Sequence, residues 1–200
     1  MNKIITISRQ FGSGGRTIGR EIAERLGLPC YDKELVEKTA GATGFSEDYI
    51  SEEAEYAPNT RSFAYSFLGR SLDGLSNSDR IWLAERKVIL SLAEQGPCVI
   101  VGRCADYLLR ERADCLNVFI HASKEFRADR IVRLYGETAV NPLKRLEEKD
   151  KKRKLNYRYF TDREWGKSEN YHLCLDSGYL GIEKTAELIL CAAGGSHGNE

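Results

Sequence analysis

The chain has 200 residues, of which 42% are hydrophobic, so it can form one domain, residues 1–200, with an ordinary core. Basic and acidic side chains balance at 30 each, which excludes nucleic-acid binding through bulk positive charge. No apolar run approaches the roughly 20 residues of a membrane-spanning helix, and a first strand beginning by Lys3 leaves no place for a secretory signal. We therefore expect a cytoplasmic protein without nucleic-acid or membrane partners, and the sequence specifies no oligomeric state.

The six cysteines are scattered, none lies in a CxxC pair, and the chain has only three histidines. This pattern is not that of a zinc site. Several of the cysteines lie in apolar runs, where cysteine acts as a small hydrophobe. We interpret all six as reduced thiols of a cytosolic protein.

The chain opens with a predicted strand at 4–7 that stops at Ser8, followed by a glycine-rich turn. Apolar residues recur at helical spacing over Thr17–Leu26, and Gly27 and Pro29 end that helix. A very short strand at 30–31 and a helix over 33–40 follow.

The pattern weakens between Gly41 and Ser78, although Ser46 could start a helix that carries Tyr49, Ile50 and Tyr56. The segment 61–77 is rich in serine and glycine but also carries Phe63, Tyr65 and Phe67. Two interpretations fit this composition. The segment is either a helix packed on the domain or a mobile flap over a ligand.

Regular alternation returns in the second half. We expect helices over 80–94, 105–112, 124–135, 141–159 and 182–190, and strands at 97–101, 116–120 and 171–175. Short apolar strands that alternate with helices indicate an α/β fold, a parallel sheet with helices on both faces. Ligands of such sheets bind at the carboxyl ends of the strands, where this chain places Ser8, Asp32, Arg103, His121 and Asp176.

The stretch RQFGSGGRT, residues 9–17, joins the first strand to the first helix. Glycines at 12, 14 and 15 let backbone N–H groups turn towards an anion, and the helix adds its positive dipole end. Aligned with the phosphate-loop pattern GxxxxGK[ST], Gly15 and Arg16 fall on the GK pair and Thr17 could offer its hydroxyl to Mg²⁺. A plain strand–turn–helix link is the alternative, and loop composition favours phosphate binding.

Two further groups carry charge that suits phosphate chemistry. Arg103 follows a buried strand and presents a planar fork of donors, although a salt bridge to Asp106 or another nearby carboxylate is the structural alternative. Asp106 could hold a magnesium-bound water or a polar group of the substrate. The basic run that follows Lys149 is either a solvated charged helix or a lid whose Arg153 and Arg158 close over a phosphoryl group, with Asp150 to orient one of them.

The chain resembles the cytidylate kinase-like family of P-loop nucleoside monophosphate kinases. The similarity extends over nearly the full length and is carried by four stretches: ISRQFGSGGRTIGREIAERLGLPCYDKEL, CVIVGRCADYLL, LNVFIHASKEFRADRIVRLYG and YHLCLDSGYLGIEKTAELI. The resemblance implies a five-stranded parallel sheet, a monophosphate-binding insertion at about 41–78 and a helical lid at about 141–166. The composition of the last residues predicts a flexible tail at 193–200. It also implies phosphoryl transfer from MgATP to a monophosphate, with CMP or dCMP as the first candidate.

The sequence departs from the family pattern GxxGxGKGT, in which Arg9 here takes the first glycine position and Gly15 the lysine position. Neither alignment supplies a lysine, and Arg16 and Arg9 are the candidates to replace it. After the second strand Asp32 is kept, while a lysine stands in the place of the family's serine and Lys38 in that of its arginine.

These considerations define an expected site. The donor phosphates would be held by Arg9, Gly12, Ser13, Gly14, Gly15, Arg16 and Thr17, and the acceptor by Asp32, Lys38, Arg103 and Asp106. Catalytic charge neutralisation would come from Arg16, Arg153 and Arg158. The alternatives are a kinase for another small metabolite and a nucleotide-binding protein with little catalysis, which the missing lysine suggests.

Overall fold

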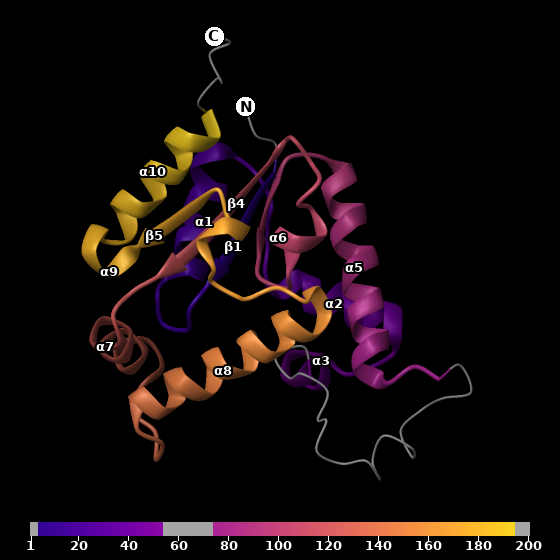
Figure 1. The fold of residues 1–200 in the computed structure, drawn as a ribbon, viewed down its shortest axis with the longest axis horizontal. Helices are drawn as coiled ribbons and strands as arrows, with labels where there is room; N and C mark the ends of the chain where they lie inside the picture. Colours follow the sequence, from indigo (N-terminus) through magenta and orange to yellow (C-terminus); the bar gives the residue numbers. More distant parts are fainter. Residues whose placement is uncertain (1–3, 54–73, 195–200) are drawn as a thin grey trace.

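The computed structural model describes residues 4–53 and 74–194 (Figure 1). Five parallel strands form one sheet in the order β2-β3-β1-β4-β5. Their bounds are Ile4–Arg9 for β1, Cys30–Tyr31 for β2, Cys98–Val101 for β3, Cys115–His121 for β4 and Leu173–Asp176 for β5. The predicted five-stranded parallel α/β fold is confirmed.

One face of the sheet packs against helices α1, Gly15–Leu26, and α10, Ile182–Gly194. Alternate residues of β1 point to this face, so Ile5 and Ile7 contact the buried side of α1. Gly19 lets α1 approach closely, because a Cβ there would lie 2.9 Å from Val101 Cγ2. This contact fixes the start of α1 at the end of β1.

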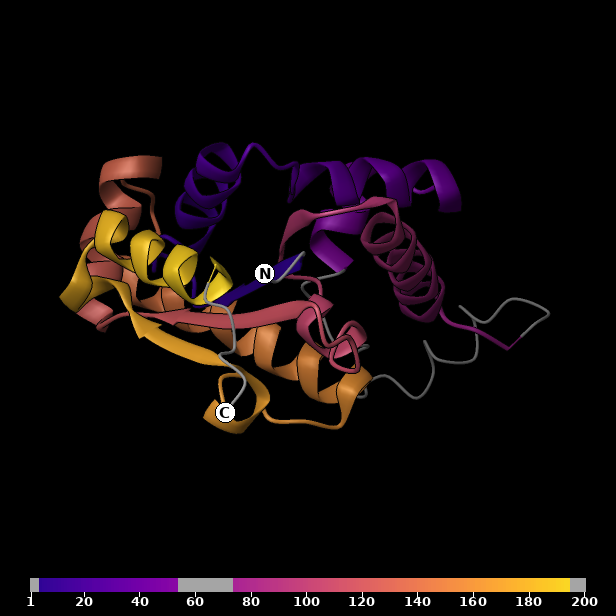
Figure 2. The same cartoon turned by 90° about the horizontal axis from the view of Figure 1, so that it is seen from above.

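The other face carries α5, Asn77–Gln95, together with the short α6, Ala105–Leu108. Helix α2, Lys33–Thr43, packs along α5. A separate aromatic cluster lies on this side of the sheet and consists of Phe119, Tyr157, Trp165 and Tyr171 with Cys104. Seen from above, α8 lies on the opposite side of the sheet from α1 (Figure 2).

The remaining elements are α3, Glu47–Glu53, α7, Lys124–Tyr135, α8, Pro142–Thr161, the 3₁₀ turn η1, Ser168–Asn170, and α9, Ser177–Leu180. Side-chain caps begin two of the long helices. Ser123 Oγ accepts from Phe126 N, and Asn141 Oδ1 accepts from Leu143 N at 2.9 Å.

Several boundaries differ from the prediction. The helix expected over 105–112 ends at Leu108, and hydrogen bonds such as Arg112 N to Leu109 O continue it as tight turns. Helix α5 begins three residues early because Ser76 and Asp79 form a reciprocal cap. The aromatic part of the segment predicted as helix or flap lies outside the described residues. Within 4–53 and 74–194, no helix is long and apolar enough to cross a membrane.

Candidate active site

The glycine loop between β1 and α1 is a tight turn with two residues in left-handed backbone conformation. Gly12 and Gly14 have φ angles of 82° and 84°, which side chains rarely adopt. A Cβ at Gly12 would also lie 2.8 Å from Arg127 O. At Gly15 a Cβ would lie 2.5 Å from Arg9 Cβ, so this position leaves room for the Arg9 side chain.

The buried side chain of Ser13 supports the loop from inside. Its buried hydroxyl lies 2.9 Å from Gln10 O and 3.2 Å from Ile120 O, and Ser177 Oγ donates to Ser13 O at 2.5 Å. These bonds fasten the loop to the ends of β4 and β5. The structure therefore gives the Ser13 hydroxyl a supporting position, and contact of Ser13 with phosphate stays a prediction.

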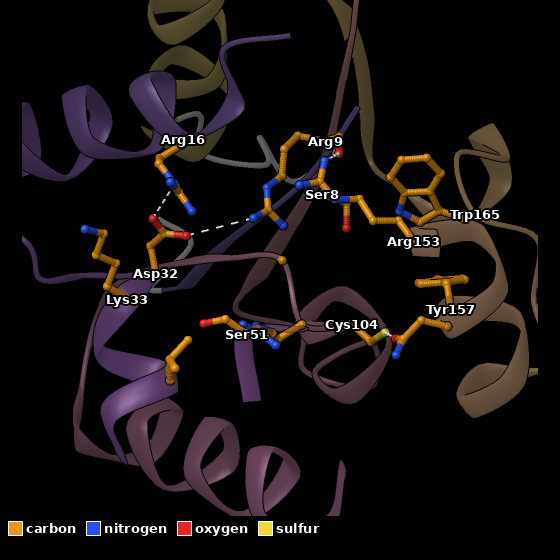
Figure 3. A pocket seen from close by; sticks show the side chains of 14 residues that line it. Ser8, Arg9, Arg16, Asp32, Lys33, Ser51, Cys104, Arg153, Tyr157 and Trp165 are labelled. Carbon is orange, nitrogen blue, oxygen red and sulfur yellow. Dashed lines mark hydrogen bonds and ion pairs between the residues drawn. The ribbon is translucent and has the colours of Figure 1, made fainter. Parts of the chain in front are cut away.

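Two cavities meet at this loop. We name them after the predicted positions of the two substrates. The donor-side cavity, about 460 Å³, is lined by Gly12, Gly14, Gly15 and Thr17, and by residues of α7 and α8. The acceptor-side cavity, about 210 Å³, lies between the ends of β1, β2 and β3 and helix α8 (Figure 3). Three arginines line both cavities: Arg9, Arg16 and Arg153.

Arg9 lies deepest of the three, beside the glycine loop and against Gly102 at the end of β3. Its side chain is 18% exposed, and Asp32 Oδ1 lies 3.9 Å from its Nη2. Burial, followed by the positive charge of Arg153, lowers the pKa of Arg9 to about 9. A guanidinium crowded by positive charge in this way is stabilised by an incoming anion.

Asp32 follows β2 and forms ion pairs with arginines from the end of β1 and the first half of α1. Arg16 Nε lies 2.5 Å from Asp32 Oδ2, and Arg9 Nη2 lies 3.9 Å from Asp32 Oδ1 (Figure 3). Arg20 Nη2 lies 3.9 Å from Oδ2. Oδ2 is buried and still accepts no well-aligned hydrogen bond within the described part of the chain. Asp32 therefore holds Arg16 on the acceptor side through this ion pair.

The acceptor side also contains Arg103, whose Nη1 donates to Glu85 Oε1 at 2.9 Å. The structural alternative for Arg103 is thus realised with Glu85 of α5 as partner, while Arg103 still lines the cavity. Burial raises the pKa of Glu85, and the charge of Arg103 opposes that shift. Lys33 lines the same cavity, whereas Lys38 is exposed on α2 and outside its lining.

Asp106 is buried below this cavity and lines neither of the two. It accepts hydrogen bonds from Ser8 Oγ at 2.9 Å and from Tyr157 Oη at 2.7 Å. Burial raises the pKa of Asp106, and these two hydrogen bonds oppose the shift. The structure places Asp106 between β1 and α8, where it joins Ser8 to Tyr157, and its role towards an acceptor stays a prediction.

Helix α8 brings Arg153 to the junction of the two cavities. Arg153 Nη1 donates to the carbonyl oxygen of Arg9 at 3.1 Å, and its guanidinium lies 5.8 Å from the ring centroid of Phe11. Asp150 does not orient this arginine directly, because its two oxygens accept from Phe11 N and Arg127 Nη1. Arg158 lies outside both cavities, 65% exposed and paired with Asp162.

Thr17 lines the donor-side cavity, but its Oγ1 accepts a hydrogen bond from Arg130 Nη2 at 2.8 Å. A guanidinium at this distance competes with a cation for the same oxygen. The described residues contain no group of three or more His, Cys, Asp or Glu side chains that could hold a metal ion. Mg²⁺ binding by Thr17 therefore stays a prediction, and it would require the Thr17 hydroxyl oxygen to exchange Arg130 for the cation.

Arg127 and Arg130 were not among the predicted site residues. Both lie on α7, where Arg127 is buried and Arg130 lies across Gly14 and lines the donor-side cavity. Their spacing of three residues places them on one face of the helix. Helical phase could have indicated that this face meets the loop, but nothing local showed which partner each arginine takes.

Residues 4–179 match the sequence profile of the cytidylate kinase-like family. The chain belongs to this family. A cytidylate kinase of Pyrobaculum calidifontis is 26% identical over 188 residues, which cover 94% of this chain and 90% of that protein. The predicted family is thus confirmed.

Solved structures show the same fold at low identity. An uncharacterised protein from Eubacterium ventriosum gives a TM-score of 0.71 at 23% identity and covers 96% of this chain and 99% of that one. A shikimate kinase from Acinetobacter baumannii in complex with shikimate gives 0.55 at 19% identity, with 95% and 92% covered. The cytidylate kinase-like chain therefore has a P-loop kinase fold.

Proposed function

We propose that this protein is an ATP-dependent phosphotransferase that moves the γ-phosphoryl group of MgATP to a small acceptor, a nucleoside monophosphate in the first instance. The observation that carries the proposal is the set of three arginines that line both cavities. A group passing between two bound molecules must cross this junction, where positive charge is concentrated. Figure 3 shows Arg9, Arg16 and Arg153 around the junction, with Asp32 beside Arg16 and Arg9.

The residues divide the work by position. The backbone of 12–15 and the start of α1 hold the donor phosphates, and Arg9 takes the place of the missing lysine beside the loop. Arg153 neutralises charge on the transferring group, while Arg16 stays on the acceptor side through Asp32. Mg²⁺, when bound, supplies charge neutralisation between the donor phosphates. No side-chain nucleophile is required, because positioning and charge stabilisation do most of the work.

CMP or dCMP is the first acceptor to test, since relatives along nearly the whole chain are named cytidylate kinases. The acceptor cavity offers Arg103 and Lys33 for a phosphate. The carboxylate of Asp32 also lines this cavity and can accept from a hydroxyl or amino group of the acceptor. That donor belongs equally to a ribose, a cytosine or another small hydroxylated metabolite.

The test is a direct product assay. Purified protein with MgATP is incubated with each nucleoside monophosphate and deoxynucleoside monophosphate, and with hydroxylated metabolites such as shikimate and gluconate. We expect ADP and a diphosphate product from one pyrimidine monophosphate well above ATP hydrolysis without acceptor. If product forms only with a hydroxylated metabolite, the acceptor is not a nucleoside monophosphate. If the protein binds ATP but turns over none of the acceptors, we would conclude that it is a nucleotide-binding protein with little catalysis.

A further inference from the structure

Two ion pairs join α7 and α8, and they differ in their surroundings. Arg127 Nη1 lies 2.6 Å from Asp150 Oδ2, with side chains 5% and 12% exposed. Lys124 Nζ lies 2.7 Å from Glu147 Oε1, with side chains 56% and 61% exposed. Exposed pairs contribute little, whereas a buried pair that is hydrogen-bonded on every side fixes geometry.

The buried pair holds the glycine loop as well as the two helices. Asp150 Oδ1 accepts from Phe11 N at 2.8 Å, and Arg127 Nη1 also donates to Phe11 O at 3.0 Å. Arg127 Nε donates in addition to Ala122 O at 3.0 Å, at the end of β4. Both backbone polar groups of Phe11 are therefore bound by one ion pair from two helices. We call Arg127, Asp150 and the Phe11 backbone the latch.

Arg153 follows Asp150 by three residues, about 4.5 Å further along the same face of α8. Its Nη1 donates to Arg9 O, two residues before Phe11, and its guanidinium lies over the Phe11 ring. Tyr157 continues this face and reaches Asp106. The latch is thus the fixed point from which the helix extends Arg153 across the loop.

We propose that Asp150 is a positioning residue, which through the latch sets where the Arg153 guanidinium stands relative to the donor phosphates. This inference rests on the proposed phosphotransferase function. The contacts of Arg153 with the loop include the Arg9 carbonyl oxygen and the Phe11 ring, and these move if α8 shifts. Asp150 touches neither cavity, so its effect on the reaction passes through the helix.

The test compares Asp150→Asn with Glu147→Gln, which neutralises the exposed pair between the same two helices. Misplacing a catalytic group by about 1 Å costs on the order of a hundredfold in rate. We expect D150N to lower kcat by about tenfold to a hundredfold at saturating MgATP and acceptor, with KM for the acceptor nearly unchanged. E147Q should keep the kcat of the wild type. Equal kcat for D150N and wild type, both folded, would overturn the proposal.

A double-mutant cycle separates positioning from general support. If Asp150 acts through Arg153, D150N should lower kcat in the wild type and have little further effect in an Arg153→Ala background. If D150N lowers kcat by the same factor in both backgrounds, Asp150 supports the structure generally, and the proposal is overturned. Thermal unfolding of each variant, measured alongside, shows whether the fold is retained at the assay temperature.

D150N leaves Arg127 buried without its charge partner and could prevent folding. In that case the variant Arg127→Met/Asp150→Asn removes both charges together, and the amide oxygen introduced at position 150 can still accept from Phe11 N. We expect this variant to fold and to show the kcat loss that depends on Arg153. Full activity of the folded double variant would overturn the proposal. A wild type that phosphorylates no acceptor rejects the proposed function itself, which is a different result from an active wild type with active variants.

Discussion

Arg153 of α8 donates a hydrogen bond to the backbone carbonyl of Arg9, and burial together with the charge of Arg153 lowers the pKa of the Arg9 guanidinium. A helix late in the chain thereby brings a second positive charge to the end of the first strand. Like charges held together without a bound anion are unfavourable, and here the fold supplies the geometry that keeps them close. We infer that the phosphate loop and α8 form a single anion site.

We therefore predict opposite outcomes for two arginines of α8. Arg153→Met should lower kcat by about two to three orders of magnitude, the scale for losing one preorganised donor to developing charge. Arg158→Met, which removes an exposed arginine paired with Asp162, should leave kcat within about twofold. Steady-state kinetics of both variants decide the matter, and equal effects would mean that α8 carries its charge differently during turnover.

Sequence reasoning selected both arginines, and helical phase explains why only Arg153 of the two lines the cavities. Residues 150, 153 and 157 recur at spacings of three and four and share a face, whereas residue 158 lies five positions beyond 153 and faces away. The sheet, its helices and the glycine loop were predictable because short apolar strands alternate with amphipathic helices. The partners of Arg103 and Arg127 were not, because Glu85 and Asp150 lie 18 and 23 residues away along the chain.

The Arg103–Glu85 pair yields a prediction about pH. In Arg103→Met the buried Glu85 loses the charge that opposes its raised pKa, so the native state binds a proton that the unfolded state releases. The free energy of unfolding of this variant should therefore fall, relative to wild type, as the pH rises from about 5 to 8. Denaturant unfolding at several pH values measures it.

The control for this experiment is Arg103→Met/Glu85→Gln, in which neither charge of the pair remains. The pH-dependent deficit should disappear in the double variant, because its cause is the Glu85 charge. Glu85→Gln alone frees Arg103 for the acceptor, so its acceptor KM should not rise. A rise would mean that the ion pair is needed to point Arg103 into the cavity.

Two glycines predict contrasting effects of a single methyl group. Gly15→Ala places a Cβ against Arg9 Cβ and displaces that side chain, so ATP should bind weakly and turnover should fall strongly. Gly41→Ala, in α2, meets no atom within 4 Å and has ordinary helical backbone, so it should stabilise the fold by about 0.5–1 kcal/mol. Thermal shifts with and without MgATP distinguish loss of binding from loss of fold.

The acceptor side can be examined through two lysines of α2. Lys33 lines the acceptor cavity beside Asp32, whereas Lys38 stands on the exposed surface of the same helix. Lys33→Met should raise the acceptor KM by about tenfold, as expected for one partly exposed charge to phosphate, with a smaller change in the KM for ATP. Lys38→Met should change neither constant. If Lys38→Met alone raised the acceptor KM, α2 would have to turn or shift on binding, because in this structure only Lys33 of the pair borders the cavity.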